Sequence, residues 1–327
     1  MTVTIHDVAR RANVSISTVS RTFTAPDLVR SDTRNRILAA ANALGYRPTG
    51  GGPRKPVHRT GHIGIIVSDL DNPFFTGVLN GVQARAREDD VAVLFANSDG
   101  DQVTEENLAR DMGKQVDGLV LCSPCMTDTQ LRDLARQTHL VLLDREVDDI
   151  PSVVMDSVGG MRQAIQHLAA LGHSRCAFVG GPRDSWANSA RRGGLHPAAE
   201  EHGVEVVEFG PFPPRFEGGL QGADLALAAG VTAMIAYNDL VAFGILARLN
   251  ARGVPVPDEV SLIGFDDLVF AAISAPPLTT VAMPTEAAGR AAVNVLLAML
   301  DNDHRTATSR LLDTYLIVRA TTAPPHA

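Results

Sequence analysis

From Gly61 onward, short runs of apolar and often β-branched residues alternate with longer stretches of helical periodicity, a pattern that few folds accommodate. Strands that alternate with helices form parallel sheets with crossover helices on both faces. The pattern therefore predicts a doubly wound α/β architecture, in which ligands bind at the carboxyl ends of the strands. Helices are expected over 74–88 and 159–171, among others. The expected strands are 62–68, 92–97, 118–122, 140–144, 152–156, 176–180, 233–237 and 260–265.

The first sixty residues differ from the rest of the chain in charge. The 327 residues carry a net charge of −8, but residues 1–60 hold ten Lys and Arg against three Asp, a net of +7. The remainder holds 19 basic and 34 acidic residues, a net of −15. A chain of this length is expected to form two or three domains. A basic module on an acidic body is typical of a phosphate-binding domain joined to a domain with another task, although a merely solvated basic surface gives the same balance.

Three short helices are expected in the basic module. The first is capped by Thr4 together with Asp7, and the second, over 16–23, is capped by Ser15. A third helix is expected over 31–44. Its inward face is expected to comprise Ile37, Leu38, Ala41 and Leu44.

Two short helices joined by a tight turn, the second polar and basic on its outer side, suit insertion into the major groove of DNA. Arg21 is placed for a bidentate contact with guanine, worth about 1–3 kcal/mol of discrimination. The pattern alone fits a structural helical hairpin equally well, and the basic surplus favours the DNA interface. Short hydroxyl side chains that reach backbone phosphates are provided by Thr4, Ser15, Thr18 and Ser20.

The same segment resembles the headpiece of the lac repressor/galactose repressor (LacI/GalR) family of bacterial regulators. The motifs that carry the resemblance are T-I-x-D-V-A, N-V-S-x-x-T-V-S-R, T-R-x-R-I-L-A-A and L-G-Y-R-P. The resemblance implies a helix-turn-helix headpiece over 1–47 that reads a double-stranded DNA operator. It places Ile16, Ser17 and Arg21 at the base-reading positions.

The linker over 48–60 departs from the family pattern. Members usually continue with a segment similar to N-A-L-A-R-S-L, a hinge helix whose leucine wedges into the minor groove. Here the chain reads T-G-G-G-P-R-K-P, with Lys55 at the leucine position. Glycine and interior proline disfavour a helix by about 1 and 3 kcal/mol per residue. We therefore expect no hinge helix and weaker kinking of the operator, with Arg54 and Lys55 reaching DNA from an extended linker.

The body resembles the effector domain of the same family along its length. The motifs are VSDLDNPFF, VDGLVL, LVLLDRE, HLAALGH, FVGGP, IAYNDLVAFG, VPDEVSLIGFDD and PLTTV. The resemblance implies an effector-binding and dimerisation domain over 61–327, with two lobes of the periplasmic-binding-protein type around a ligand cleft. Lobe 1 would comprise about 61–157 and 285–312, and lobe 2 about 158–284 and 313–327. The expected fold class is thus α/β, with a small all-α headpiece and a two-lobed, doubly wound parallel-sheet effector domain.

The resemblance also assigns ligand positions, residue by residue. Carboxylates, amides and guanidiniums pair with vicinal hydroxyls, and an aromatic face covers the apolar side of a sugar. Phe212 would take the aromatic stacking position. The first lobe would contribute Asp69, Phe74, Phe75 and Asp144, and the second lobe Arg191, Phe212, Asn238 and Asp266.

Several of these positions also have a structural interpretation. Asp266 fits a helix cap, and Phe74 and Phe75 fit plain core positions. Arg191 has a neighbour, Arg192, that is equally able to face the cleft. The segment before this pair departs from the family pattern through Trp186 and Ala187, so no known member's ligand can be transferred.

Other binding chemistries find little support. There is no G-x-G-x-x-G after the first strand, no Walker A motif and no metal-binding spacing, so neither a nucleotide cofactor nor a metal is expected. Cys122 and Cys125 form a C-x-x-C, which is either a redox pair or two small residues in a loop. The missing thioredoxin-like helix favours the loop.

These features predict a DNA-binding transcriptional regulator, a repressor that binds a near-palindromic operator as a homodimer. Its effector would be a sugar, nucleoside or sugar phosphate. A periplasmic solute-binding protein would share the body but needs a signal peptide, and a sugar-metabolising enzyme needs catalytic motifs; neither is visible. Without a secretory signal or an apolar run of roughly 18 residues, a cytoplasmic protein with no membrane role is expected. No leucine heptads follow the body, which favours a dimer over a tetramer.

Overall fold

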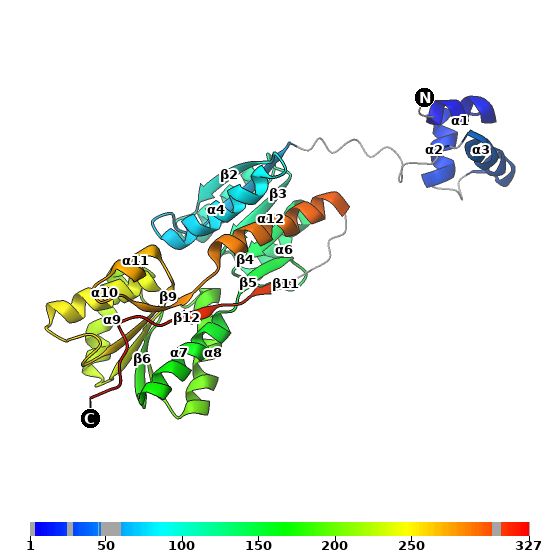
Figure 1. Cartoon of the computed structure of the whole chain (residues 1–327). Helices are drawn as coiled ribbons and strands as arrows, with labels where there is room; N and C mark the ends of the chain where they lie inside the picture. Colours follow the sequence, from blue (N-terminus) through cyan, green and yellow to red (C-terminus); the bar gives the residue numbers. More distant parts are fainter. Residues whose placement is uncertain (1–3, 25–28, 45, 47–59, 303–308, 327) are drawn as a thin grey trace. The chain divides into compact units, whose positions relative to one another are not determined.

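The computed structural model divides the chain into two compact units, Met1–Arg59 and Thr60–Ala327 (Figure 1). It describes residues 4–24, 29–44, 46, 60–302 and 309–326. The linker expected over 48–60 lies outside the described residues apart from Thr60, and so do Arg54 and Lys55.

The first unit is a three-helix headpiece with a small core of its own. Val8, Val19 and Ile37 come from three different helices and are fully buried in this core. The prediction that Leu38 points inward is wrong, because this side chain is 39% exposed. The buried face of the third helix follows Ile37 and Ala41, and the residue next to Ile37 is turned by about 100° around the helix axis. The helices are α1 Ile5–Ala12, α2 Ile16–Thr24 and α3 Ser31–Leu44.

The two predicted caps of the headpiece are confirmed. The Asp7 carboxylate accepts hydrogen bonds from the amide of Thr4 at 3.0 Å and from its hydroxyl at 2.7 Å. The Ser15 hydroxyl oxygen accepts from the amide of Thr18 at 3.2 Å and thereby caps α2. Between the helices, Asn13 adopts a left-handed conformation (φ 51°, ψ 54°) that ends α1 and turns the chain toward α2.

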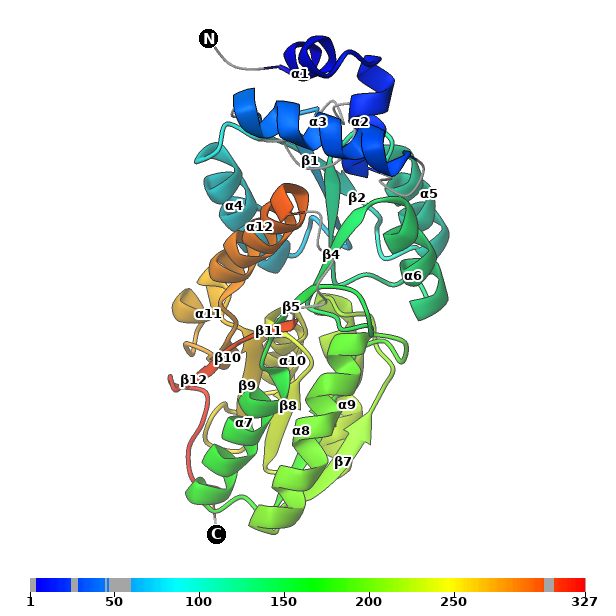
Figure 2. The ribbon, with the colours of Figure 1, turned by 90° about the vertical axis from the view of Figure 1, so that its right-hand side faces the viewer.

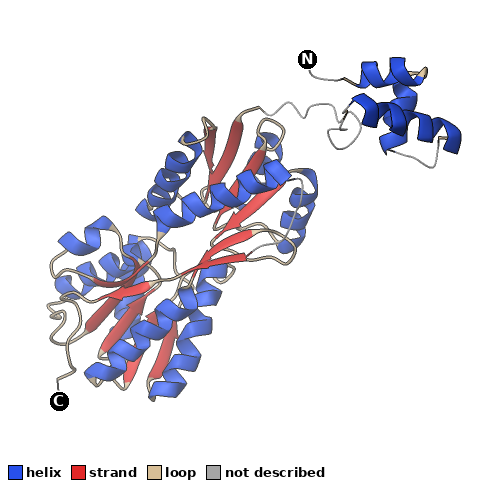
Figure 3. Ribbon diagram, turned by 45° about the vertical axis from the view of Figure 1, so that its right-hand side comes forward, coloured by secondary structure: helices blue, strands red, loops and turns tan. Residues whose placement is uncertain are grey.

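The second unit contains two six-stranded sheets, each with helices on both faces (Figure 3). The first sheet consists of β1 His62–Val67, β2 Ala92–Asn97, β3 Gly118–Cys122, β4 His139–Leu143, β5 Ser152–Met155 and β11 Ser309–Leu312. The strand order is β11-β5-β4-β3-β1-β2, and every neighbouring pair is parallel. In this doubly wound order the chain switches direction between β1 and β3, which opens a crevice at the carboxyl ends of these strands.

The second sheet repeats the same order. It consists of β6 Arg175–Val179, β7 Glu205–Phe209, β8 Ala233–Ala236, β9 Ser261–Asp266, β10 Thr279–Ala282 and β12 Tyr315–Ile317. The order is β12-β10-β9-β8-β6-β7, and all pairs are parallel except β10 with β12. Here the switch in direction lies between β6 and β8.

Each sheet and its helices form a lobe, and the chain passes between the lobes after β5, after β10 and between β11 and β12. Neither lobe is therefore a continuous stretch of sequence. The helices of the first lobe are α4 Pro73–Arg87, α5 Gln102–Met112, α6 Asp128–Gln137 and α12 Thr285–Asn302. Those of the second lobe are α7 Ser157–Leu171, α8 Trp186–His202, α9 Phe216–Ala228, α10 Asp239–Ala251 and α11 Val269–Ile273.

Helices α4 and α12 lie side by side although about 200 residues separate them (Figure 2). A Cβ atom on Gly81 would lie 2.0 Å from the carbonyl oxygen of Glu286, and one on Gly289 would lie 2.2 Å from that of Val78. Only glycine fits at these two positions, because the helix backbones are in direct contact.

The eight predicted strands are all present, with ends within one residue of the prediction. Four further strands, β7, β10, β11 and β12, were not predicted. Each has only three to five residues, and β7, β11 and β12 are partly exposed at or near the sheet edges, so they lack the buried apolar run of a central strand. Among the helices that the structure describes, none combines the length and hydropathy of a membrane span.

Candidate functional site

The outer face of α2 carries the residues expected to read DNA bases. Ile16 is 42% exposed, and Ser17 and Arg21 are exposed as well. Among the residues that the structure describes, none forms an ion pair or hydrogen bond with the Arg21 guanidinium. The fork of donors that a guanine edge requires is thus available.

The hydroxyls expected at phosphates are mostly engaged within the headpiece. The Thr4 hydroxyl donates to Asp7, as described above. The Ser15 hydroxyl lies 2.8 Å from that of Ser17 and 2.7 Å from that of Thr18. Their phosphate role stays a prediction, and it requires these hydrogen bonds to rearrange on DNA.

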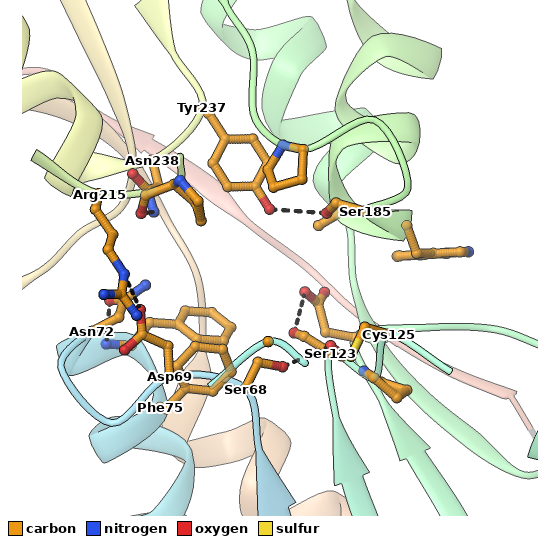
Figure 4. A pocket seen from close by; sticks show the side chains of 18 of the residues that line it. Ser68, Asp69, Asn72, Phe75, Ser123, Cys125, Ser185, Arg215, Tyr237 and Asn238 are labelled. Atoms are coloured by element: carbon orange, nitrogen blue, oxygen red, sulfur yellow. Dashed lines mark hydrogen bonds and ion pairs between the residues drawn. The ribbon is translucent and has the colours of Figure 1, made fainter. Parts of the chain in front are cut away.

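A cavity of about 700 Å³ lies where the carboxyl ends of the strands of both lobes face one another (Figure 4). This volume is in the usual range for small-molecule sites, roughly 300–1,000 Å³. Its polar lining residues follow strands directly: Ser68 and Asp69 follow β1, Ser123 follows β3, Asp144 follows β4, and Asn238 comes two residues after β8. The cavity therefore lies where the doubly wound topology predicts a ligand site.

Seven of the eight residues assigned to the ligand line this single cavity. Phe212 does not. Its ring packs on the second lobe's core, and a Cβ atom on Gly222 would lie 3.2 Å from the ring. The missing side chain of Gly222 leaves room for the ring there, so the stacking role assigned to Phe212 is corrected. The seven that line the cavity are Asp69, Phe74, Phe75, Asp144, Arg191, Asn238 and Asp266.

The alternative interpretations of these residues are also resolved in geometry. Phe74 and Phe75 are core residues and lining residues at once, with ring centroids 5.1 Å apart in an edge-to-face arrangement. Asp266 does not cap α11, whose N-cap is Leu268. Arg192 points to solvent, where its guanidinium lies 2.7 Å from the Glu208 carboxylate.

The cavity lining includes a buried ionic cluster of Asp144, Arg191 and Asp266. Each of the three residues is at most 6% exposed. The Arg191 guanidinium lies 3.5 Å from the Asp266 carboxylate, and it is held between the rings of Tyr237 and Phe265 at 4.4 and 4.2 Å. Asp144 Oδ1 and the Nε and Nη1 atoms of Arg191 have no hydrogen-bond partner among the described residues. Buried polar groups without partners are costly, so a polar ligand or an ordered water that reaches these atoms would stabilise the cluster.

Burial dominates the electrostatics of this cluster. It raises the pKa of the Asp144 carboxyl to about 6, although the Arg191 guanidinium opposes the shift. It also raises the pKa of Asp266 well above the ordinary value, again against Arg191. Because one guanidinium serves two buried carboxyls, the cluster is closest to neutral when one of them keeps its proton. The backbone of both residues has a positive φ, 57° at Asp144 and 117° at Asp266. Such backbone strain in non-glycine residues is typical of functional sites.

Two other predicted ligand residues already have protein partners. The Asp69 carboxylate accepts from the Arg215 guanidinium at 3.1 Å, and this ion pair joins the two lobes across the cavity. The Asn238 side chain caps α10 by accepting from the amide of Val241 at 2.9 Å, and it donates to the Pro214 carbonyl at 3.0 Å. These two residues shape the wall of the cavity, whereas the ionic cluster offers unpaired atoms.

The loop formed by residues 123–126 lines the cavity and is hydrogen-bonded to Glu105 of α5. Its buried carboxylate accepts from the amides of Cys125 and Met126 at 2.9 and 2.8 Å. Arg145 fixes the same loop by donating to the Pro124 carbonyl at 2.7 Å. Glu105 is therefore a positioning residue for the cavity wall.

The C-x-x-C pair behaves as part of this loop. Neither thiol forms a disulfide, and Cys122 is completely buried. Burial and the nearby Glu105 carboxylate raise the pKa of the Cys125 thiol to about 12, so almost no thiolate exists near neutral pH. This favours the loop interpretation over a redox pair.

We expect the native protein to react very slowly with Ellman's reagent at pH 8, because the thiolate is the reacting species. The same protein unfolded in guanidinium chloride should release the signal of all 3 cysteines within minutes. Rapid reaction of one native thiol, lost in Cys125→Ser, would contradict the buried and protonated state described above.

Several lining residues were missed from the sequence. Ser123 and Tyr237 carried a usable signal, since each ends or follows a predicted strand. Arg215 had no such signal in the sequence, because it lies in the loop before α9, whose path cannot be predicted from a local sequence pattern. Trp186 was noticed only as a departure from the family pattern, and the structure places it in the cavity lining.

Comparison with known proteins agrees with this geometry. Residues 4–49 match the family described as bacterial regulatory proteins, lacI family, and residues 165–322 match a periplasmic binding protein-like domain. The HTH-type transcriptional repressor CytR of Escherichia coli strain K12 is 31% identical, with 98% of this chain and 96% of CytR covered.

Two solved structures are similar along nearly the whole chain. A transcriptional regulator CelR–cellobiose complex has a TM-score of 0.73 at 29% identity, covering 98% of this chain and 100% of that one. The lac repressor dimer bound to operator and the anti-inducer ONPF has a TM-score of 0.74 at 25% identity, covering 99% and 100%. With a matching headpiece, a matching body and full-length relatives that regulate transcription rather than catalyse reactions, this chain belongs to the LacI family of bacterial transcriptional regulators.

Proposed function

We propose that the protein is a repressor that binds a near-palindromic operator as a homodimer and responds to a small carbohydrate-like effector. The observation that carries the proposal is the presence, in one chain, of an exposed recognition helix and a cavity whose buried polar atoms lack partners. The proposed parts are a headpiece over 1–47, a linker over 48–60 and an effector-binding and dimerisation domain over 61–327. Acting on operator DNA, the protein would work in the cytoplasm.

Exposed apolar side chains on both lobes support self-association. Phe95 of β2 is 58% exposed, and on α11 Val269, Phe270 and Ile273 are 69, 47 and 74% exposed. Large exposed apolar groups of this kind mark association surfaces, and a twofold homodimer buries the same patch on each partner.

The chemical class of the effector is inferred from the lining of the cavity and from a similar solved structure. The CelR complex contains cellobiose, and the unpaired carboxylate and guanidinium atoms of the ionic cluster suit the hydroxyls of such a ligand. Effector binding would close the two lobes and alter the dimer contact, and by linkage operator binding must change effector affinity by the same factor.

The proposal is tested by footprinting the protein on DNA upstream of its own gene, with and without sugars. We expect protection of a near-palindromic site and a change in its affinity with at least one saccharide. Protection of no site, or turnover of a sugar without DNA binding, would refute the proposed function.

The role of Arg21 gives a sharper test of the same interface. Arg21→Ala should lose about 1–3 kcal/mol on the operator and discriminate less at one guanine, because a bidentate base contact disappears. Binding curves on the operator and on single-base variants measure the effect. Lys55→Ala is the comparison: it should weaken binding to all sequences and reduce the slope of log affinity against log salt by about one unit. A uniform loss on all sequences for Arg21→Ala would contradict base reading.

A further inference from the structure

Next to the crossover after β5 lies a second cavity of about 360 Å³, here called the hinge cavity. It is lined by Glu146, Met155, Asp156, Ser157, Trp186 and Leu311, among others. Trp186 also lines the main cavity, and its side chain is therefore shared by both. Resting on the proposed sugar-responsive function, we propose that Trp186 is the sugar-stacking residue, and that the effector is an unphosphorylated saccharide of at least two rings whose second ring occupies the hinge cavity.

The position of Trp186 is fixed by the start of α8. The Ser185 hydroxyl oxygen accepts from the amide of Asn188 at 3.2 Å, and the same hydroxyl lies 3.0 Å from the Tyr237 hydroxyl. The indole itself is only half-buried and belongs to none of the apolar core clusters of the described residues. Within the described part of the chain, nothing accepts a hydrogen bond from its N–H. A rigid aromatic side chain that lines a cavity instead of the core suits stacking on the apolar face of a sugar ring.

A second, independent observation in the hinge cavity points to a polar ligand. The Ser157 side chain is 2% exposed, and its hydroxyl has no hydrogen-bond partner among the described residues. The adjacent Asp156 and Glu146 carboxylates accept from the Gly159 amide and the Ser309 hydroxyl, and their remaining lone pairs can accept from ligand hydroxyls. Partnerless buried atoms thus occur on both sides of Trp186: the ionic cluster in the main cavity and Ser157 in the hinge cavity. A ligand that satisfies both sets must extend past the indole.

The charge of the cavity lining disfavours a phosphorylated effector. Five carboxyl side chains line the main cavity, namely Asp69, Asp99, Asp144, Asp184 and Asp266, against the two guanidiniums of Arg191 and Arg215. Both guanidiniums already face a carboxylate, Asp266 and Asp69 respectively. The described lining of the hinge cavity adds Glu146 and Asp156 and includes no basic side chain. A phosphate group would meet uncompensated negative charge on either side of Trp186.

The experiment uses the full-length protein and isothermal calorimetry with glucose, ribose, cellobiose, maltose and glucose 6-phosphate. Because Trp186 is the single tryptophan of the chain, its fluorescence reports directly on occupancy beside the ring. We expect a disaccharide to bind more tightly than its monosaccharide and to change the emission of Trp186. Glucose 6-phosphate should bind at least about tenfold more weakly than glucose.

Four variants separate stacking from folding. Trp186→Ala should weaken disaccharide binding about tenfold or more, whereas Trp186→Phe, which keeps an aromatic face, should stay within about threefold. Ser157→Ala should weaken the disaccharide about fivefold and leave the monosaccharide unchanged. Phe212→Leu, outside the cavity, should leave both affinities unchanged.

The inference is overturned if Trp186→Ala binds the disaccharide as tightly as the parent, if the phosphorylated sugar binds best, or if none of the neutral saccharides binds at millimolar concentration. An operator mobility shift on the same preparations keeps the two proposals apart. Operator binding together with a monosaccharide that binds as tightly as any disaccharide would refute this inference alone, and saccharide binding without operator binding would refute the repressor function alone.

Discussion

Arg191→Met is expected to lower the free energy of unfolding of the second unit by about 3–5 kcal/mol near neutral pH. Among the described residues, the substitution removes the guanidinium that faces Asp144 and Asp266, two residues that are at most 6% exposed. It also removes the cation that lies between the rings of Tyr237 and Phe265. Urea denaturation followed by Trp186 fluorescence measures the loss, because this tryptophan lies in the second unit.

The adjacent arginine provides a matched control. Arg192→Met removes an exposed guanidinium that faces Glu208, and it should change stability by no more than about 0.5 kcal/mol. The double variant Arg191→Met/Asp266→Asn should recover part of the loss, because one of the two stranded carboxyls is gone. The loss should also shrink at pH 5, where the carboxyls protonate. Equal effects of Arg191→Met and Arg192→Met would contradict the buried cluster.

Asp144→Asn is expected to stabilise the protein without effector and to weaken effector binding. Burial raises the pKa of this carboxyl to about 6 in the folded protein, above its ordinary value near 3.8. The folded state therefore binds a proton more tightly than the unfolded state, and stability falls as the pH rises from about 4 to about 6 and stays reduced above it. Removing the charge should recover about 1–3 kcal/mol at pH 7, measured by urea denaturation.

The same carboxylate should make effector binding depend on pH. Ligand hydroxyls donate to the ionised form, so affinity should increase as the pH rises through about 6 and level off above 7. Asp144→Asn should bind the effector more weakly and lose this dependence. Calorimetry from pH 5 to pH 8 checks both statements, with Asp184→Asn, an exposed carboxyl at the cavity rim, as the control. An identical pH profile for Asp144→Asn and the parent would contradict the role of Asp144.

Much of the fold and part of the cavity follow from local sequence patterns. Buried parallel strands appear as short apolar runs, and the residue after such a run lies at the carboxyl edge of the sheet. The family resemblance assigned Asp69 and Asp144 to the ligand, and both residues line the cavity just beyond the ends of buried strands. Residues on longer loops follow no such pattern: Arg215 crosses the cleft to Asp69, and the direction of Phe212 depends on the space left by Gly222.

The headpiece shows the same limit at smaller scale. Its caps depend on residues three positions apart, so Thr4 and Ser15 were identified directly. Leu38 was assigned to the wrong face of α3. Helical periodicity gives the spacing of apolar residues along a helix. It does not give the positions at which α1 and α2 pack against α3, and these positions decide which residues are buried.

The three crossings between the lobes have a consequence for synthesis on the ribosome. The first sheet receives β11 at its edge and α12 on its face only from the last part of the chain, after the whole central portion of the second lobe has been made. At about 5–20 residues per second, the half-finished sheet waits on the order of ten seconds or more with the apolar face of α4 uncovered. The nascent protein is therefore exposed to aggregation and to chaperones for that interval, and nonsense mutations that remove α12 and β11 should leave both lobes incomplete.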